Sequence, residues 1–102
     1  MAQGAGAALL EEISYGADGQ LLSASFMDYL IPTAADVPLV EVLHLHTPST
    51  VHELGTKGAG EGGTIGATAA IANAVADALS ATDAVLPFSP ERVLALVERG
   101  QR

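Results

Sequence analysis

Cysteine is absent from this sequence and aromatic residues are scarce, and both shortages limit what the chain can do. Without cysteine there is no disulfide and no thiolate for zinc, for an iron–sulfur cluster or for nucleophilic catalysis. Any redox chemistry must therefore use a cofactor. Hydrophobic residues make up 49% of the 102 positions, but only two tyrosines and two phenylalanines are present. Aliphatic residues and alanine must build the core, which favours close approach of backbones.

Positive charge is also scarce, with four Lys and Arg against twelve Asp and Glu, for a formal net charge of −8. This balance opposes the phosphate contacts that supply most nucleic-acid affinity, so nucleic acid is not an expected partner. No apolar run approaches the roughly 18 residues of a membrane-spanning helix, so no transmembrane segment is expected. The first residues lack the basic and apolar regions of a signal peptide, which predicts a cytoplasmic protein.

Three strands are predicted in the first half of the chain. Ile13–Tyr15 and Leu21–Met27 flank a Gly-Ala-Asp-Gly turn signal, and the second of these alternates apolar and polar residues. Leu39–Leu45 is mostly apolar on both faces, as in a sheet that is covered on at least one side. The sequence thus predicts a three-stranded, mainly antiparallel sheet.

Three helices are predicted around these strands. The first runs from Ala2 to Glu12 without an N-cap residue, and the second is Ala-rich and follows the glycine-rich run that ends at Gly63. The last begins with Ser89 as N-cap and Pro90 at the first helical position. The element order αβββαα predicts an α+β fold in a single domain, 1–102, with helices packed on the sheet.

One carboxylate lies within the glycine-rich run Lys57–Gly63. Glu61 precedes the second predicted helix, whose N-terminal amides and dipole favour an ionised carboxylate. A general base needs that state, although a helix-capping Glu in a surface turn is the commoner origin of such a pattern. Gly58, Gly60 and Gly63 also match the dinucleotide-binding spacing, but no strand leads into the first glycine and Glu61 would repel a pyrophosphate.

Two further constellations have ordinary explanations. His44 and His46 lie on one face of the third predicted strand, and His52 and Glu53 follow it. These four residues are possible zinc ligands, but they do not form a compact ligand motif. Paired strand histidines are more often surface residues, so no metal ligand is assigned. Gln3 lies among small residues and would present an amide to a ligand, although a fraying helix start explains the same pattern.

Six segments, taken in order, form a recognisable pattern: Gln3–Glu12, Asp18–Leu22, Ser25–Tyr29, Ala35–Pro38, Thr47–Pro48 and Lys57–Gly66. This pattern resembles the C-terminal end of the large subunit of molybdenum hydroxylases. The resemblance covers nearly the whole chain and looks more like the carbon monoxide dehydrogenase branch than the animal xanthine oxidase branch, with aldehyde oxidases as further members.

The resemblance implies a role for four residues. In this family the glutamate that corresponds to Glu61 is the active-site base beside the molybdenum. By the same likeness, Gln3 would hydrogen-bond the molybdopterin cytosine dinucleotide, and the backbone at Ala59 and Gly60 would lie against the cofactor. The implied function is that of an oxidoreductase segment that supplies the base of a molybdenum-dependent dehydrogenase or hydroxylase.

The family's large subunit is much longer, so the resemblance also implies that this chain is a C-terminal fragment of a molybdopterin-binding catalytic domain. A helix that begins uncapped at Ala2 is what a boundary inside a larger domain would produce. The expected partners are the remainder of the molybdenum subunit and iron–sulfur and flavin subunits or domains. The isolated fragment is expected to be inactive and without cofactor. The alternative is a non-catalytic scaffold that keeps the fold and self-associates into a homo-oligomer through its Ala-rich helix.

Overall fold

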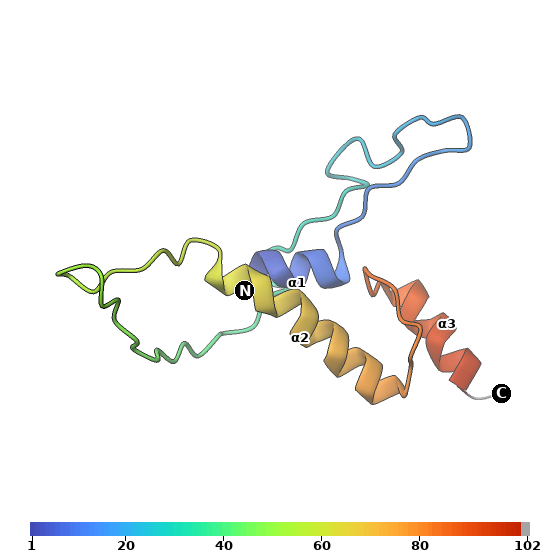
Figure 1. The fold of residues 1–102 in the computed structure, drawn as a ribbon. Coiled ribbons are helices and arrows are strands. Elements are labelled where there is room, and N and C mark those ends of the chain that lie inside the picture. The colour runs from blue at the N-terminus through green and yellow to red at the C-terminus, as the bar shows by residue number, and fades with distance from the viewer. Residues whose placement is uncertain (101–102) are drawn as a thin grey trace.

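The computed structural model describes residues 1–100 as three helices joined by two long excursions. Helix α1 spans Ala2–Leu9, α2 spans Gly62–Leu79 and α3 spans Pro90–Gly100. Between α1 and α2 the chain leaves the helical body twice, first as an arm and then as a separate loop (Figure 1). The Cα radius of gyration is 17.8 Å, against about 13 Å for a compact chain of this length. The described chain is therefore extended rather than globular.

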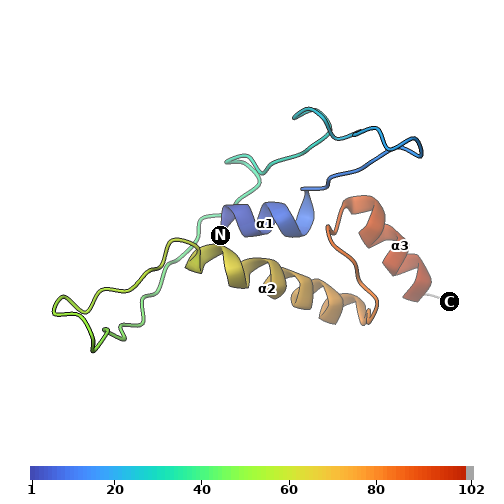
Figure 2. The same ribbon diagram turned by 45° about the horizontal axis from the view of Figure 1, so that its top comes forward.

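Close contact between α1 and α2 forms the centre of the helical body (Figure 2). The hydroxyl of Thr68 donates a 3.1 Å hydrogen bond to the carbonyl of Gly4, across the two helices. Near the C-terminal end of α1, the amide of Phe88 donates a 2.7 Å bond to the carbonyl of Ala8. The buried apolar residues of this body are Ala8, Ala67 and Phe88. The core thus depends on small residues and close backbones, as the composition predicts.

The predicted three-stranded sheet is wrong, because residues 1–100 contain three helices and no strand. What remains of the first hairpin is its turn. Tyr15 and Leu21 form one isolated antiparallel bridge, and the amide of Leu22 bonds the carbonyl of Ser14 at 2.9 Å. The ladder stops there because the chain turns again at Ser25, whose carbonyl accepts a 2.7 Å bond from the amide of Tyr29.

The third predicted strand, Leu39–Leu45, has no pairing partner among the described residues. A strand is defined by hydrogen bonds to a neighbouring segment, and alternation in one segment does not supply that neighbour. The αβββαα order and the α+β class are therefore replaced, for residues 1–100, by an all-helical body with two non-helical excursions.

The three predicted helices are confirmed, with one boundary changed. Helix α1 ends at Leu9 rather than Glu12, and the amides of Leu10 and Glu11 both bond the carbonyl of Gly6. At α3, the Ser89 hydroxyl accepts a 3.4 Å bond from the amide of Arg92, which is N-cap geometry. Within residues 1–100, no helix combines the length and apolar character needed to cross a membrane.

Candidate functional site

Glu61 is the residue immediately before α2, with φ −107° and ψ 0°. Its carbonyl accepts bonds from the amides of Thr64 at 2.9 Å and Ile65 at 3.2 Å, so the start of α2 fixes its backbone. Its side chain is exposed and makes no capping hydrogen bond. Helix capping, the ordinary explanation of this carboxylate, is therefore not what its side chain does here. No contact within residues 1–100 holds the carboxylate rigidly either.

Gln3 and Glu61 line one shallow cavity of about 210 Å³, together with Thr64 and Ile65. The hydroxyl of Thr64 donates a 3.5 Å hydrogen bond to Oε1 of Gln3, so the first turn of α2 meets the first turn of α1. The two helix starts lie side by side in both ribbon views (Figures 1 and 2). Packing of α1 on α2 thus brings together an amide and a carboxylate that are far apart in the sequence.

The glycines around Glu61 have no structural reason inside the described chain. A Cβ built on Gly58, Gly60 or Gly62 would meet nothing within 4 Å, and none of the three has a positive φ. Glycine in such places costs backbone entropy without solving a local problem. Together with exposed Ala59, they form a stretch of open main chain around Glu61, which lines the cavity. This open stretch fits a bulky group that packs directly against the backbone.

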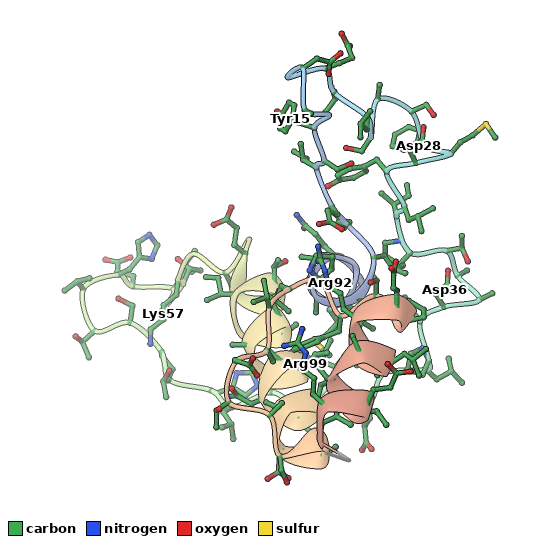
Figure 3. The ribbon with its side chains drawn as sticks, turned by 90° about the vertical axis from the view of Figure 1, so that its right-hand side faces the viewer. Tyr15, Asp28, Asp36, Lys57, Arg92 and Arg99 are labelled. Carbon is green, nitrogen blue, oxygen red and sulfur yellow. The ribbon has the colours of Figure 1, made fainter. Side chains whose placement is uncertain are left out.

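Cavity size does not by itself single out this site. A cavity of about 190 Å³ lies beside α3, lined by Asp83, Arg92 and Arg99 among others. There Arg99 bonds Asp83 at 3.3 Å, an exposed ion pair. Figure 3 shows both arginines at the helical body, remote from Lys57 in the loop. The Gln3–Glu61 cavity differs in that open glycine backbone flanks Glu61 in the chain and no hydrogen bond within residues 1–100 engages its carboxylate.

The other sequence candidates do not join this site. Among residues 1–100 no cluster of three His, Cys, Asp or Glu side chains is arranged for a metal ion. The rings of His44 and His46 are 6.3 Å apart between centroids, and Nδ1 of His52 accepts a 3.2 Å bond from the amide of Leu54. Lys57 donates a 3.0 Å bond to Thr47 within its own loop. No strand leads into Gly58, so the dinucleotide-binding alternative lacks its structural context.

Sequence reasoning missed three side-chain interactions that shape the region. One is the bond of Thr64 to Gln3, and another is the ion pair of Arg92 with Glu12, just after α1. The third is the 2.6 Å bond that the Tyr29 hydroxyl donates to Oε2 of Glu11, which raises the pKa of Tyr29. Burial and the charge of Glu11 add to that shift. Of these three interactions, only the bond from Thr64 had a signal in the sequence, because Thr64 follows Glu61 by three residues.

The first 38 residues match a known family. Residues 1–38 match the sequence model of the molybdopterin cofactor-binding domain. These residues include Gln3 and all of α1, one wall of the cavity described above.

Curated relatives extend the similarity across most of the chain. The nicotine 6-hydroxylase large subunit of Paenarthrobacter nicotinovorans is 45% identical over 95 residues, which is 90% of this chain and 12% of the relative. The carbon monoxide dehydrogenase large chain of Afipia carboxidovorans is 44% identical over 71 residues, or 70% of this chain and 9% of the relative. The predicted resemblance is thus confirmed.

Solved structures share the conformation as well as the sequence. Quinoline 2-oxidoreductase from Pseudomonas putida 86 matches 95% of this chain at a TM-score of 0.86 and 45% identity, over 13% of its own length. A Cu,Mo-containing CO dehydrogenase matches 92% of this chain at a TM-score of 0.86 and 37% identity, over 12% of its length. The chain therefore spans roughly an eighth of these relatives, and its extended shape is one that occurs inside far larger subunits.

Proposed function

We propose that this chain, a homologue of one segment of molybdenum hydroxylase large subunits, is the C-terminal part of such a subunit and supplies its active-site base. The observation that carries the proposal is the shared cavity of Gln3 and Glu61 beside open glycine backbone. Of the four residues that the family resemblance implicates, Gln3 and Glu61 line this cavity, and Ala59 and Gly60 come directly before Glu61 in the chain.

Glu61 is suited to hold and release a proton. Its carboxylate is exposed, has no hydrogen-bond partner within residues 1–100 and stands at the start of an 18-residue helix. A general base needs a carboxylate that is free to meet the group it deprotonates. An Oε atom of Glu61 that has no other partner can accept a proton from a group placed in the cavity.

Gln3 and the backbone at Ala59 and Gly60 are suited to hold the cofactor. The amide of Gln3 uses its Oε1 in the bond from Thr64, which leaves its NH₂ group to donate to an acceptor in the cavity. The open main chain at Gly60 admits a bulky group without meeting a side chain. When bound, the molybdenum cofactor supplies two-electron redox chemistry. We assign it the cytosine dinucleotide form.

The whole protein would act as a molybdenum-dependent dehydrogenase or hydroxylase similar to carbon monoxide dehydrogenase. The relatives' names cover nicotine, quinoline and carbon monoxide, so no one substrate follows from them. Iron–sulfur and flavin subunits or domains are the proposed electron-transfer partners, in the cytoplasm. One relative is named as a subunit of a dehydrogenase complex, which supports partner subunits in general.

Replacement of Glu61 by Gln in the complete enzyme tests the base. The amide keeps the size of the side chain but accepts no proton, so turnover should fall by about 10²- to 10⁴-fold. Molybdenum content should stay near that of the unmodified enzyme, since the backbone at Gly60 is unchanged. Glu53→Gln, an exposed carboxylate in the preceding loop, is the matched control and should keep full activity. A fully active Glu61→Gln enzyme would refute the role.

Exposed apolar side chains favour one alternative, a self-associating scaffold. Phe26 is 77% exposed, Met27 89% and Leu39 fully exposed in the described chain. Light scattering of the isolated chain at low and high concentration separates the two functions. A defined homo-oligomer that forms without cofactor supports the scaffold, whereas a soluble monomer removes it.

A further inference from the structure

The segment Leu39–Leu45 is an extended, apolar stretch that touches little of the described chain. Leu39 is 105% exposed, Leu43 83% and Leu45 97%. From residue 37 to residue 48 no backbone amide or carbonyl forms a hydrogen bond with another described residue. The segment belongs to the loop that projects away from the helices and returns to α2 (Figure 1).

Side chains on the two faces of this segment differ in exposure. In an extended chain alternate residues share a face, which places Leu39, Leu43 and Leu45 together. Val40 and Val42, on the other face, are only 42% and 64% exposed. The leucine face is therefore the one that still lacks a cover.

Such a segment does not stabilise itself in water. A single extended strand has no internal hydrogen bonds, and exposed apolar strands readily pair with a neighbouring backbone. Yet the conformation of the whole chain matches that of solved large subunits at a TM-score of 0.86. The matched region is 13% of that chain, so in that relative most of the polypeptide that could support this conformation lies outside the match.

We propose that Leu39–Leu45 is a β-strand added to a sheet in the remainder of the same large subunit, with the leucine face buried against it. The proposal rests on the proposed function, because that function supplies the remainder of the subunit. Main-chain hydrogen bonds to the neighbouring strand join the segment to the sheet, and the leucines fill alternate positions of the apolar surface. The loop between this strand and α2, which carries Glu61, is thereby anchored at both ends.

A second copy of this chain is a less suitable cover. The formal net charge is −8, so two copies would repel each other at close range. Glu41 also lies on the leucine face, between Leu39 and Leu43, and would add its charge to that interface. The remainder of a subunit can provide a donor for this carboxylate, whereas a copy brings another acidic surface.

Hydrogen–deuterium exchange followed by mass spectrometry tests the pairing in the complete large subunit. Amides 39–45 should exchange on the order of 100-fold slower or more than the exposed loop amides of residues 52–53. Pairing on one side protects every second amide, whereas pairing on both sides protects all of them. Exchange of 39–45 as fast as that of the loop overturns the proposal.

Two leucine variants test the buried face. Leu43→Ser should lower the resistance of the complete subunit to limited proteolysis, and Leu54→Ser should not. Leu54 is 81% exposed but lies in the turn closed by the bond from Gly55 to His52. Equal effects of the two variants would overturn the proposal, as would protection of 39–45 that appears only when the concentration of the isolated chain is raised.

The two experiments distinguish failure of the strand proposal from failure of the proposed function. If Glu61→Gln keeps full activity, the base assignment falls while slow exchange at 39–45 still supports the added strand. If 39–45 exchanges rapidly in an enzyme that Glu61→Gln inactivates, only the strand pairing falls.

Discussion

A β-carbon placed on Gly4 of α1 would lie 2.5 Å from the β-carbon of Ala67 in α2. No pair of real side-chain carbons tolerates that distance, so the two helices cross at a separation that only glycine permits. This crossing also holds Gln3 beside Thr64 and therefore beside Glu61. The spacing of two helices thus determines the geometry of the proposed site.

Gly4→Ala should separate α1 from α2 and destabilise the chain. Overpacking of a close contact costs about 1–3 kcal/mol, which should appear as a lower urea midpoint in circular dichroism. Ala67→Gly should relieve the clash in the double variant, apart from its own cost of about 1 kcal/mol in a helix. If the double-mutant cycle shows no coupling free energy between positions 4 and 67, the contact is contradicted.

Gly60→Val should leave the chain folded but reduce cofactor loading in the complete subunit. A Cβ at Gly60 meets nothing within residues 1–100, so the added side chain is harmless unless another group occupies that space. Molybdenum content per purified subunit measures the effect. Gly100→Val, at another position with open space, is the control and should load normally. Full molybdenum content in the Gly60→Val subunit would argue against cofactor contact there.

Tyr29 should titrate above its ordinary pKa of 10.0, chiefly because its hydroxyl donates to Glu11. The folded chain favours the protonated phenol, so the interaction contributes stability below pH 10.0 and loses it as pH rises through the raised pKa. The midpoint of the Tyr29 titration is measured from the ultraviolet absorbance of tyrosinate, after subtraction of the absorbance of the Tyr29→Phe variant. Glu11→Gln should bring that midpoint down, and an unchanged value would show that the hydrogen bond is not its cause.

Asp36 should titrate below its ordinary pKa of 3.8, because Thr33 donates to its carboxylate. The Thr33 hydroxyl bonds Oδ2 at 2.7 Å and the Thr33 amide bonds the same oxygen at 2.8 Å. Stability from this turn is present above pH 3.8 and is lost as pH falls through the lowered pKa. Carboxyl NMR of Asp36 measures the midpoint, and Thr33→Val should raise it. If Asp36 has the same midpoint in the Thr33→Val chain as in the unmodified chain, the Thr33 hydroxyl is not the cause of the lowered pKa.

The helices could be predicted from sequence because their signals are local. Ser89 and Pro90 begin α3 through contacts within one turn, and the small residues of α2 follow a helical period. The unusual setting of Glu61 was equally visible, since glycine and carboxylate are adjacent in the chain. The strands could not be predicted in this way, because Leu39–Leu45 has strand composition but no partner among the described residues.

By itself, then, the sequence determined the three helices, the acidic charge, the dependence of any redox chemistry on a cofactor, and the presence of one carboxylate among glycines. Only the tertiary structure decided that Gln3 and Glu61 share a cavity, and that the residues between them form open excursions instead of a sheet. The physical reason is the range of the interactions. Caps and helical hydrogen bonds act within a few residues, whereas helix crossing and strand pairing depend on segments that are distant in the chain.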